Sequence, residues 1–345
     1  MKTKGSTRRA VIIGAGAGAT AALGFGLEPG RARAEAPPIV IKFSHVVASD
    51  APKGKAAERF KALAEKYTNG RVKVEVYHNS TLYKDKEELE ALQLGAVQML
   101  APSNAKFGPL GVKDFEVLDL PMLIPSLKAL RRVTEGPIGR AMLDKLQTVG
   151  LVGLGYWDNG FKQMTANREL RTVADFQGQK IRIQSSKVLL AQFKALGALP
   201  QVLAFSEVYQ ALQTGVCDGQ ENTPTNIWTQ KMQEVQKHMT ISDHGYIGYI
   251  LVMGKPFWDG LPADIRPLLE KAVAESTTFI NELAEKENAE AIAAIKATGK
   301  TAVITLTPAE REEWRKAMAP VYEEMAPRVG KQLIEDIQKT VSTTG

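Results

Sequence analysis

Hydrophobic and polar positions follow two different periods along residues 39–101. Residues 39–44 form a short apolar run that predicts a buried strand, and residues 71–77 alternate strictly between valine and polar side chains. Between them, the spacing predicts a helix that opens at Pro52, carries an apolar stripe on one face and stops at Gly70. A helix over 86–94 and a short strand ending at Ala101 follow. This alternation is typical of α/β folds.

The same alternation continues toward the C-terminus. We predict strands over 151–157 and 180–183, and helices over 138–147, 188–196 and 206–214. Such repeated units favour parallel sheets covered by helices. Residues 262–298 are compatible with one helix of about 50 Å, because the internal Pro267 falls in its first turns. That length exceeds one lobe, so we expect the helix to brace two, and a capping box is predicted at 307–310.

The first 34 residues have the order of a signal peptide. A basic segment, 2–9, precedes an apolar run, 10–27, and small residues then form A-x-A patterns that end at Ala34 and Ala36. We expect export to the periplasm and cleavage after one of these alanines, with the twin-arginine and general secretory routes both open. Residues 14–19 imitate a dinucleotide-binding turn, but they lie inside this segment, so no cofactor is expected.

Composition and charge narrow the function further. The chain has 345 residues, 44% hydrophobic and 24% charged, so it can bury a full core, and the about 310 residues left after cleavage suggest two lobes. Most of the net charge of +6 lies in the targeting segment, and the remainder has 38 basic against 37 acidic residues. Binding to nucleic acid or to an anionic membrane surface is therefore not expected. Cys217, the single cysteine, is predicted to be buried, and we expect a monomer.

Arg182 is the strongest candidate for binding chemistry. It stands between Ile181 and Ile183 in a predicted buried strand, where an arginine needs an anionic partner. The guanidinium group matches a carboxylate with two parallel hydrogen bonds. An internal pair with an aspartate or glutamate is the alternative.

Two lysines follow the ends of other predicted strands, where ligands bind in open α/β sheets. Lys162 comes just after the turn at Asn159–Gly160, and Lys106 comes after the strand that ends at Ala101, three residues beyond Ser103. A solvated surface position is the alternative for both lysines. Three cations converging on one cleft would suit a ligand with two carboxylates, whereas one would suit a monoacid.

Four further residues complete the candidate site, namely Asn222, Ser103, His45 and Tyr249. Asn222 can donate to a carboxylate, and Glu221 is a candidate internal partner for a lysine. His45 follows the first strand, with a structural role as the alternative, and Tyr249 can line a pocket or pack in the core. No zinc spacing, nucleophile elbow or P-loop is present, so the sequence indicates a binding protein and not an enzyme.

Several stretches together resemble the solute-binding proteins of TRAP transporters, a family that includes C4-dicarboxylate-binding members. The similarity extends in order over essentially the whole chain after the targeting segment. It is carried by residues 42–47, 86–95, 158–163 and, most specifically, 205–222.

The resemblance implies a two-lobed, periplasmic-binding-protein-like α/β fold with hinge strands and a long bracing helix. Lobe I would comprise residues 35–159 plus about 248–285, and lobe II residues 160–247 plus about 286–345. Such a protein closes around its ligand and delivers it to a membrane permease driven by an ion gradient. A binding protein of an ATP-driven transporter is the main rival, followed by an exported enzyme or a sensory subunit.

The resemblance also implies residue roles. Arg182 corresponds to the carboxylate-clamping arginine and Asn222 to its partner asparagine. Lys162 and Lys106 stand where the sialic-acid-binding branch has arginines, so a compact diacid such as malate, succinate or fumarate is expected. Other organic acids (keto, hydroxy, aromatic or sulfonate) remain the alternative. Thr223, inserted before Pro224, departs from the family motif and puts the local turn in doubt.

Overall fold

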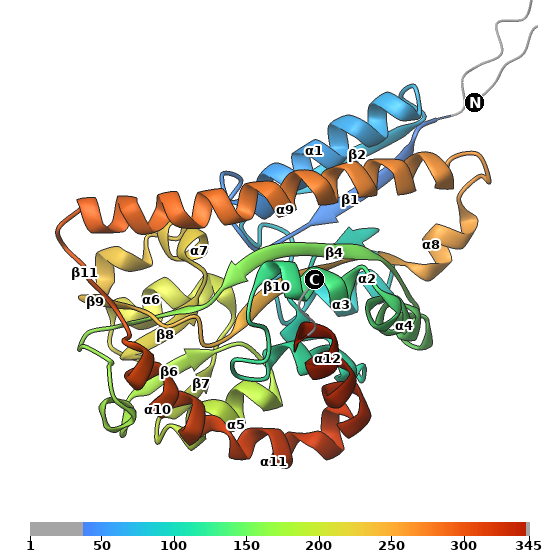
Figure 1. Ribbon diagram of the computed structural model, residues 1–345. Helices are drawn as coiled ribbons and strands as arrows, with labels where there is room; N and C mark the ends of the chain where they lie inside the picture. The colour runs from blue at the N-terminus through green and yellow to red at the C-terminus, as the bar shows by residue number, and fades with distance from the viewer. Residues whose placement is uncertain (1–36, 343–345) are drawn as a thin grey trace, which may run out of the picture. The chain divides into compact units, whose positions relative to one another are not determined.

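The computed structural model describes residues 37–342, and this part of the chain packs as one unit from Pro38 onward. The predicted signal peptide, residues 1–34, and the alanines of both predicted cleavage sites lie outside the described residues. The described strands form two sheets (Figure 1). The first sheet contains, in spatial order, β2 (Val72–Tyr77), β1 (Ile39–Ser44), β3 (Met99–Leu100), β10 (Tyr246–Gly254) and β4 (Leu151–Phe161). The second contains β11 (Ala302–Thr305), β9 (His238–Ile241), β5 (Gln163–Ala166), β8 (Gly219–Asn222), β6 (Lys180–Ile183) and β7 (Leu199–Val202).

Helices cover both sheets and join them. They are α1 (Pro52–Tyr67), α2 (Glu88–Gln93), α3 (Leu127–Thr134), α4 (Pro137–Lys145), α5 (Lys187–Ala195), α6 (Val208–Gln213), α7 (Pro224–Thr229), α8 (Lys255–Gly260), α9 (Arg266–Ala297), α10 (Pro308–Met318), α11 (Pro320–Val329) and α12 (Lys331–Ser342). None of the helices within residues 37–342 is long and apolar enough to cross a membrane.

Most elements predicted from the periodicity are confirmed. β1 and β6 span the predicted residues, and α1 begins at Pro52 and ends before Gly70, whose φ of 78° only glycine adopts readily. The predicted long helix is α9, with 32 residues and a proline in its first turn. The capping box is present at Thr307, whose side chain accepts from the backbone N–H of Glu310.

The expectation of parallel sheets is wrong, because both sheets are mixed. β1 pairs in parallel with β2 and β3, but β10 runs antiparallel to β3 and β4, and β5 runs antiparallel to β8 and β9. β10 is absent from the predicted elements, because an uninterrupted run of nine buried residues fits a segment of a buried helix as well as a buried strand. The chain consequently passes between the sheets at Lys162, from β4 to β5, and at residues 242–245, from β9 to β10.

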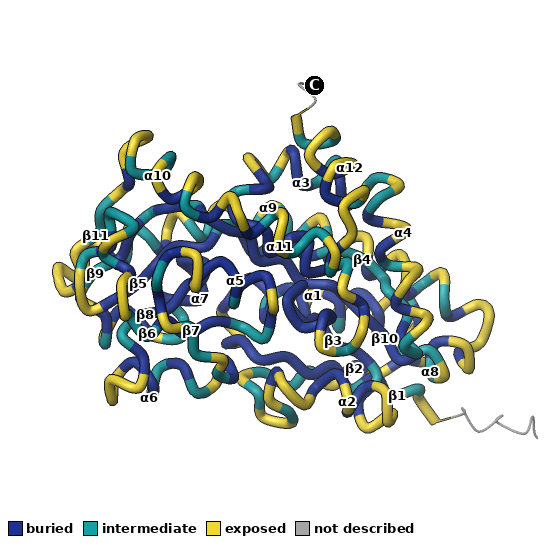
Figure 2. The backbone as a smooth tube through the Cα atoms, turned by 90° about the horizontal axis from the view of Figure 1, so that it is seen from below, coloured by how far each residue is buried: buried dark blue, intermediate teal, exposed yellow. Residues whose placement is uncertain are grey.

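α9 braces the two halves, as predicted. It packs on helix α1 and on β4 of the first sheet, and on helix α7 and β11 of the second sheet. Figure 1 shows it along one whole side of the molecule. The backbone of the central strands is buried, and exposed segments lie at the periphery (Figure 2). α11 packs on α5 of predicted lobe II, and α12 packs on α3 of predicted lobe I. Because the C-terminal helices contact both predicted lobes, these contacts do not test the lobe boundaries, which stay a prediction.

Candidate functional site

A small cavity lies between the two sheets and is lined from both sides. Its volume is about 20 Å³, which is room for about one water molecule. Four of the residues predicted from the sequence line it, namely Ser103, Lys106, Asn222 and Tyr249. The cavity therefore brings together residues that lie up to 146 positions apart in the chain.

Arg182 lies on β6 and is fully buried. Its Nε and Nη2 atoms donate to the backbone carbonyl of Leu203 at 3.1 and 2.8 Å, while its buried Nη1 has no hydrogen-bond partner. Burial lowers the pKa of Arg182, and the charge of Asp85 counteracts this effect. The side chain is not part of the cavity lining, but it interacts electrostatically with Asp85 and Lys106, which are. One edge of the guanidinium group, Nε and Nη2, is thus fixed by the backbone, and Nη1 on another edge is an unused donor.

Lys106 already has an anionic partner inside the protein. Its Nζ lies 2.5 Å from Oδ2 of Asp85 and donates to the hydroxyl of Ser185 at 3.3 Å. Burial alone would raise the pKa of Asp85, but Lys106 and the charge of Arg182 lower it below its ordinary value. Asp85 also accepts from the backbone N–H of Phe205 at 3.2 Å. Asp85 is therefore an ionised carboxylate held between two cations.

Lys53 and Glu88 line the cavity too, although neither was predicted as a site residue. Burial lowers the pKa of Lys53 to about 8 and raises that of Glu88 to about 7, while each charge opposes the shift of the other. A signal was available in the sequence, because Lys53 stands at i−3 and i−7 from the buried Ala56 and Phe60 on the apolar stripe of α1. Glu88 stands likewise on the buried face of α2. A charged residue within an apolar stripe indicates a buried charge.

The neutral polar groups of the lining join the two sides of the cavity. Ser103 accepts from Nε2 of Gln184 at 2.7 Å, and Tyr249 accepts from Nδ2 of Asn226 at 3.4 Å. Oδ1 of Asn222 accepts from Nδ2 of Asn226 at 2.9 Å and from the backbone N–H of Thr223 at 3.0 Å. Both bonds use Oδ1, which leaves the Nδ2 donor of Asn222 for other partners.

Lys162 is fully buried at the crossing between the sheets and does not line the cavity. Its Nζ lies 2.9 Å from Glu221, and the second carboxylate oxygen of Glu221 lies 3.1 Å from Nε2 of His244. The hypothesis that Glu221 pairs internally with a lysine is confirmed. The role of Lys162 in ligand binding stays a prediction, and in this structure its charge is directed to Glu221.

His45 is also fully buried and lies outside the cavity lining. Its Nε2 lies 2.9 Å from Nδ1 of His78, whose own Nε2 lies 3.0 Å from Glu58. Burial, followed by the charge of Lys53, lowers the pKa of His45 well below its ordinary value, so it is neutral at physiological pH. The hydrogen bonds that link His45 to His78 and His78 to Glu58 agree with a structural role for His45, the alternative to a role in binding.

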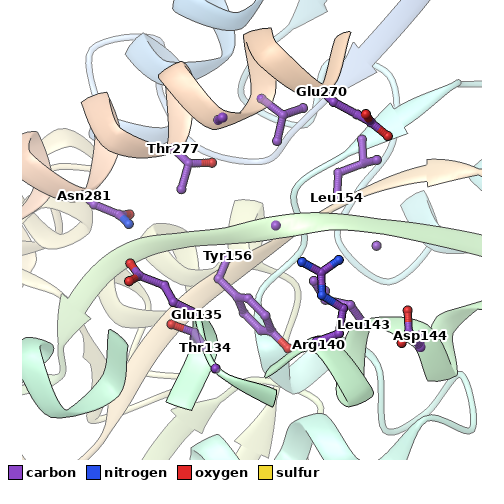
Figure 3. Close-up of a pocket in the computed structure, with 15 residues that line it drawn as sticks. Thr134, Glu135, Arg140, Leu143, Asp144, Leu154, Tyr156, Glu270, Thr277 and Asn281 are labelled. Atoms are coloured by element: carbon purple, nitrogen blue, oxygen red, sulfur yellow. The ribbon is translucent and has the colours of Figure 1, made fainter. Parts of the chain in front are cut away.

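A second and larger hollow lies between α4, β4 and α9 (Figure 3). It measures about 370 Å³, with Arg140 and Asp144 on the side of α4 and Glu270 on the side of α9. These charged side chains are exposed to solvent, and none of the predicted site residues lines it. A larger volume does not make it the better site, because exposed charges lose most of their binding strength to water.

Comparison with known proteins agrees with this geometry. Residues 43–328 match the model of the bacterial extracellular solute-binding proteins of family 7, DctP. The chain is 60% identical over 332 residues to the C4-dicarboxylate-binding periplasmic protein DctP of Rhodobacter capsulatus, which covers 96% of this chain and 98% of that protein.

Two solved structures of TRAP periplasmic solute-binding proteins are similar over most of the chain. One, from Shewanella oneidensis with bound succinate, is 43% identical with a TM-score of 0.87 and covers 88% of this chain and 100% of its own. Another, from Pseudomonas aeruginosa with bound L-malate, is 44% identical with a TM-score of 0.81 and covers 83% and 100%. The resemblance and the two-lobed fold predicted from the sequence are thereby confirmed. The chain belongs to family 7 of the bacterial extracellular solute-binding proteins, which bind solutes for transporters and are not enzymes.

Proposed function

We propose that the protein is exported to the periplasm, captures a C4-dicarboxylate such as succinate, malate or fumarate between its two lobes, and delivers it to a TRAP membrane permease. The charge balance around the cavity carries the choice of a diacid. Lys53, Lys106 and Arg182 contribute three positive charges, and Asp85 contributes one negative charge. Burial keeps Glu88 largely protonated below about pH 7, because its pKa is raised to about 7.

Below about pH 7 the resulting local charge of about +2 matches a diacid with both carboxyl groups ionised, as expected for carboxyl groups whose ordinary pKa lies near 4. A monoacid would leave one buried positive charge without a partner, which is costly. The names of the relatives agree with this choice, since the protein from Rhodobacter capsulatus is described as C4-dicarboxylate-binding and two similar structures hold succinate and L-malate.

Capture requires the two sides of the cavity to separate. A cavity of about 20 Å³ is far smaller than the roughly 300–1,000 Å³ of ordinary ligand pockets. The hydrogen bonds from Gln184 to Ser103 and from Asn226 to Tyr249 cross the cavity and would break on opening. On closure around the ligand, water leaves and the charge-assisted bonds strengthen. The ligand shifts the balance toward the closed form only by its higher affinity for that form.

A thermal-shift screen of small organic acids on the purified mature protein tests the proposal. Ligands that bind the folded form raise its melting temperature, so succinate, malate or fumarate should give the largest shifts. A keto, aromatic or sulfonic acid that stabilises the protein while the C4 diacids do not would refute the choice of ligand. N-terminal sequencing of the exported protein tests the cleavage site, and light scattering tests the expected monomer.

A further inference from the structure

We propose that Lys53 binds the second carboxylate of the ligand, the one that Arg182 does not hold, and so selects diacids over monoacids. This inference rests on the proposed function, which supplies the diacid. It assigns to Lys53 the part in diacid binding that the family resemblance implies for Lys162 and Lys106.

The first support is that Lys53 is a buried cation with few partners. Its side chain is almost fully buried, and its Nζ donates a hydrogen bond of 3.0 Å to the backbone carbonyl of Ala101. No carboxylate among the described residues forms a salt bridge with it, and the charges of Glu88 and Asp85 act on it from beyond ion-pair distance. An ammonium group has three donors, and a buried charge with a single neutral acceptor is costly. Such a group is retained at a cost in stability, which a ligand anion would offset.

The second support comes from the other lysines. Lys162 lies outside the cavity lining and pairs with Glu221 at 2.9 Å, and Lys106 pairs with Asp85 at 2.5 Å. Lys53 is in the lining and lacks an equivalent ion pair. Among the three, only its charge is both at the cavity and without a close carboxylate.

The third support is that the Lys53 ammonium is held in place. Nζ lies 3.9 Å from the centre of the Tyr249 ring, and Tyr249 itself lines the cavity. Lys53 stands in the first turn of α1, which has no acidic residue there and no side-chain cap at Ala51. The positive end of the helix dipole therefore adds to the lysine charge and favours an anion at this place. A charge fixed before the ligand arrives loses little entropy on binding.

Calorimetry with succinate and with butyrate, which has the same chain length and one carboxyl group fewer, tests the role of Lys53. Lys53→Met removes the charge and keeps the shape, and we expect succinate to bind at least about 30-fold more weakly. Butyrate, measured by competition against succinate, should change less than about threefold. Lys271→Met is a matched control, because Lys271 also lies over a tyrosine ring, Nζ to the centre of Tyr67 at 4.3 Å, but on the exposed surface.

The melting temperature of the ligand-free variant separates binding from structure. If Lys53 serves the ligand, Lys53→Met should melt at the same temperature as the wild type or higher, since a poorly paired buried charge has been removed. Succinate affinity within threefold of the wild type would overturn the inference. So would a lower melting temperature with equal losses for succinate and butyrate, which indicates a structural lysine. A wild-type protein that binds no C4 diacid would instead refute the proposed function.

Discussion

The buried pair of Lys162 and Glu221 allows a sharp test of what each lysine does. Both side chains are at most 1% exposed, and their charged atoms lie 2.9 Å apart at the crossing between the sheets. Lys162→Met removes one partner and leaves His244 as the hydrogen-bond partner of Glu221 among residues 37–342. We expect this substitution to destabilise the fold strongly, because an uncompensated carboxylate remains in the interior.

The size of the effect follows from the pKa of Glu221. Burial alone would raise this pKa, but Lys162 and the hydrogen bond from His244 lower it from 4.5 to about 2. At about 1.4 kcal/mol per pKa unit, the favourable surroundings of the carboxylate contribute about 3 kcal/mol at neutral pH. A lowered folded-state pKa means that this contribution is full above about pH 4.5 and is lost as the pH falls toward 2. The value agrees with the 3–5 kcal/mol typical of breaking a buried pair.

Urea unfolding at pH 7 measures the free energies of unfolding of the wild type, Lys162→Met, Glu221→Gln and the double variant. Each single variant should lose about 3 kcal/mol, and the double variant should lose much less than their sum. Lys255→Met is the control, since Lys255 pairs with Asp259 at 2.7 Å on the surface and should cost less than about 1 kcal/mol. Wild-type stability of Lys162→Met, combined with a large loss of succinate affinity, would refute a structural lysine.

Three other predictions concern the ligand, the pH and the hinge. Arg182→Ala should weaken succinate binding by about 2–5 kcal/mol in calorimetry, because the free Nη1 donor is lost. Arg182→Lys should also bind poorly, because lysine lacks the planar guanidinium fork. Unchanged affinity in both variants would refute the proposed clamping of a carboxylate by Arg182. Succinate affinity should fall between pH 6 and 8.5, because Glu88, with a pKa of about 7, gains a negative charge and Lys53, with a pKa of about 8, loses its positive charge. In Lys53→Met only Glu88 of this pair titrates, so adding Glu88→Gln should remove the remaining fall; an unchanged fall would exclude Glu88 as its source. Gly160→Ala should lower the free energy of unfolding by about 1–3 kcal/mol, as measured in urea, because the backbone φ is 133° and a Cβ would lie 2.5 Å from Nδ2 of Asn288. The control is Gly260→Ala at an exposed position, and a smaller loss of stability at Gly160 than at Gly260 would contradict the expected strain.

The sequence predicts the elements that show a clear period and misses those that do not. Strands such as β1 and β6 are short and have distinct ends, β1 as an apolar run and β6 as an alternation of charged and apolar residues, so their limits can be read from the pattern. β10 is buried along its whole length, and no local signal tells that it inserts between β3 and β4. The antiparallel pairs of β10 with β3 and β4 result from that insertion, which brings together residues far apart in the chain.

Prediction of the candidate site is limited in the same way, because local sequence does not reveal contacts between residues far apart in the chain. The burial of Arg182 is predictable because its strand is expected to be covered on both faces, and the structure buries the side chain fully. Whether a buried cation faces a ligand or an internal acid depends on residues far away in the chain, such as Asp85 for Lys106 and Glu221 for Lys162. Local periodicity detects the buried charge and does not identify its partner. Lys53 was detectable in this way, as a charge on the stripe of α1.

Asn288, on the bracing helix α9, links β4 of the first sheet to α7, the helix that follows β8 of the second sheet. Its Nδ2 donates to the carbonyl of Asn159 at the end of β4 at 2.6 Å, and its Oδ1 accepts from the backbone N–H of Thr225 on α7 at 3.0 Å. A single amide therefore pins three segments at one corner, and the halves cannot move apart in translation without breaking it. We expect opening to be a rotation with this corner as its pivot, so that side chains far from Asn288 travel the greatest distance.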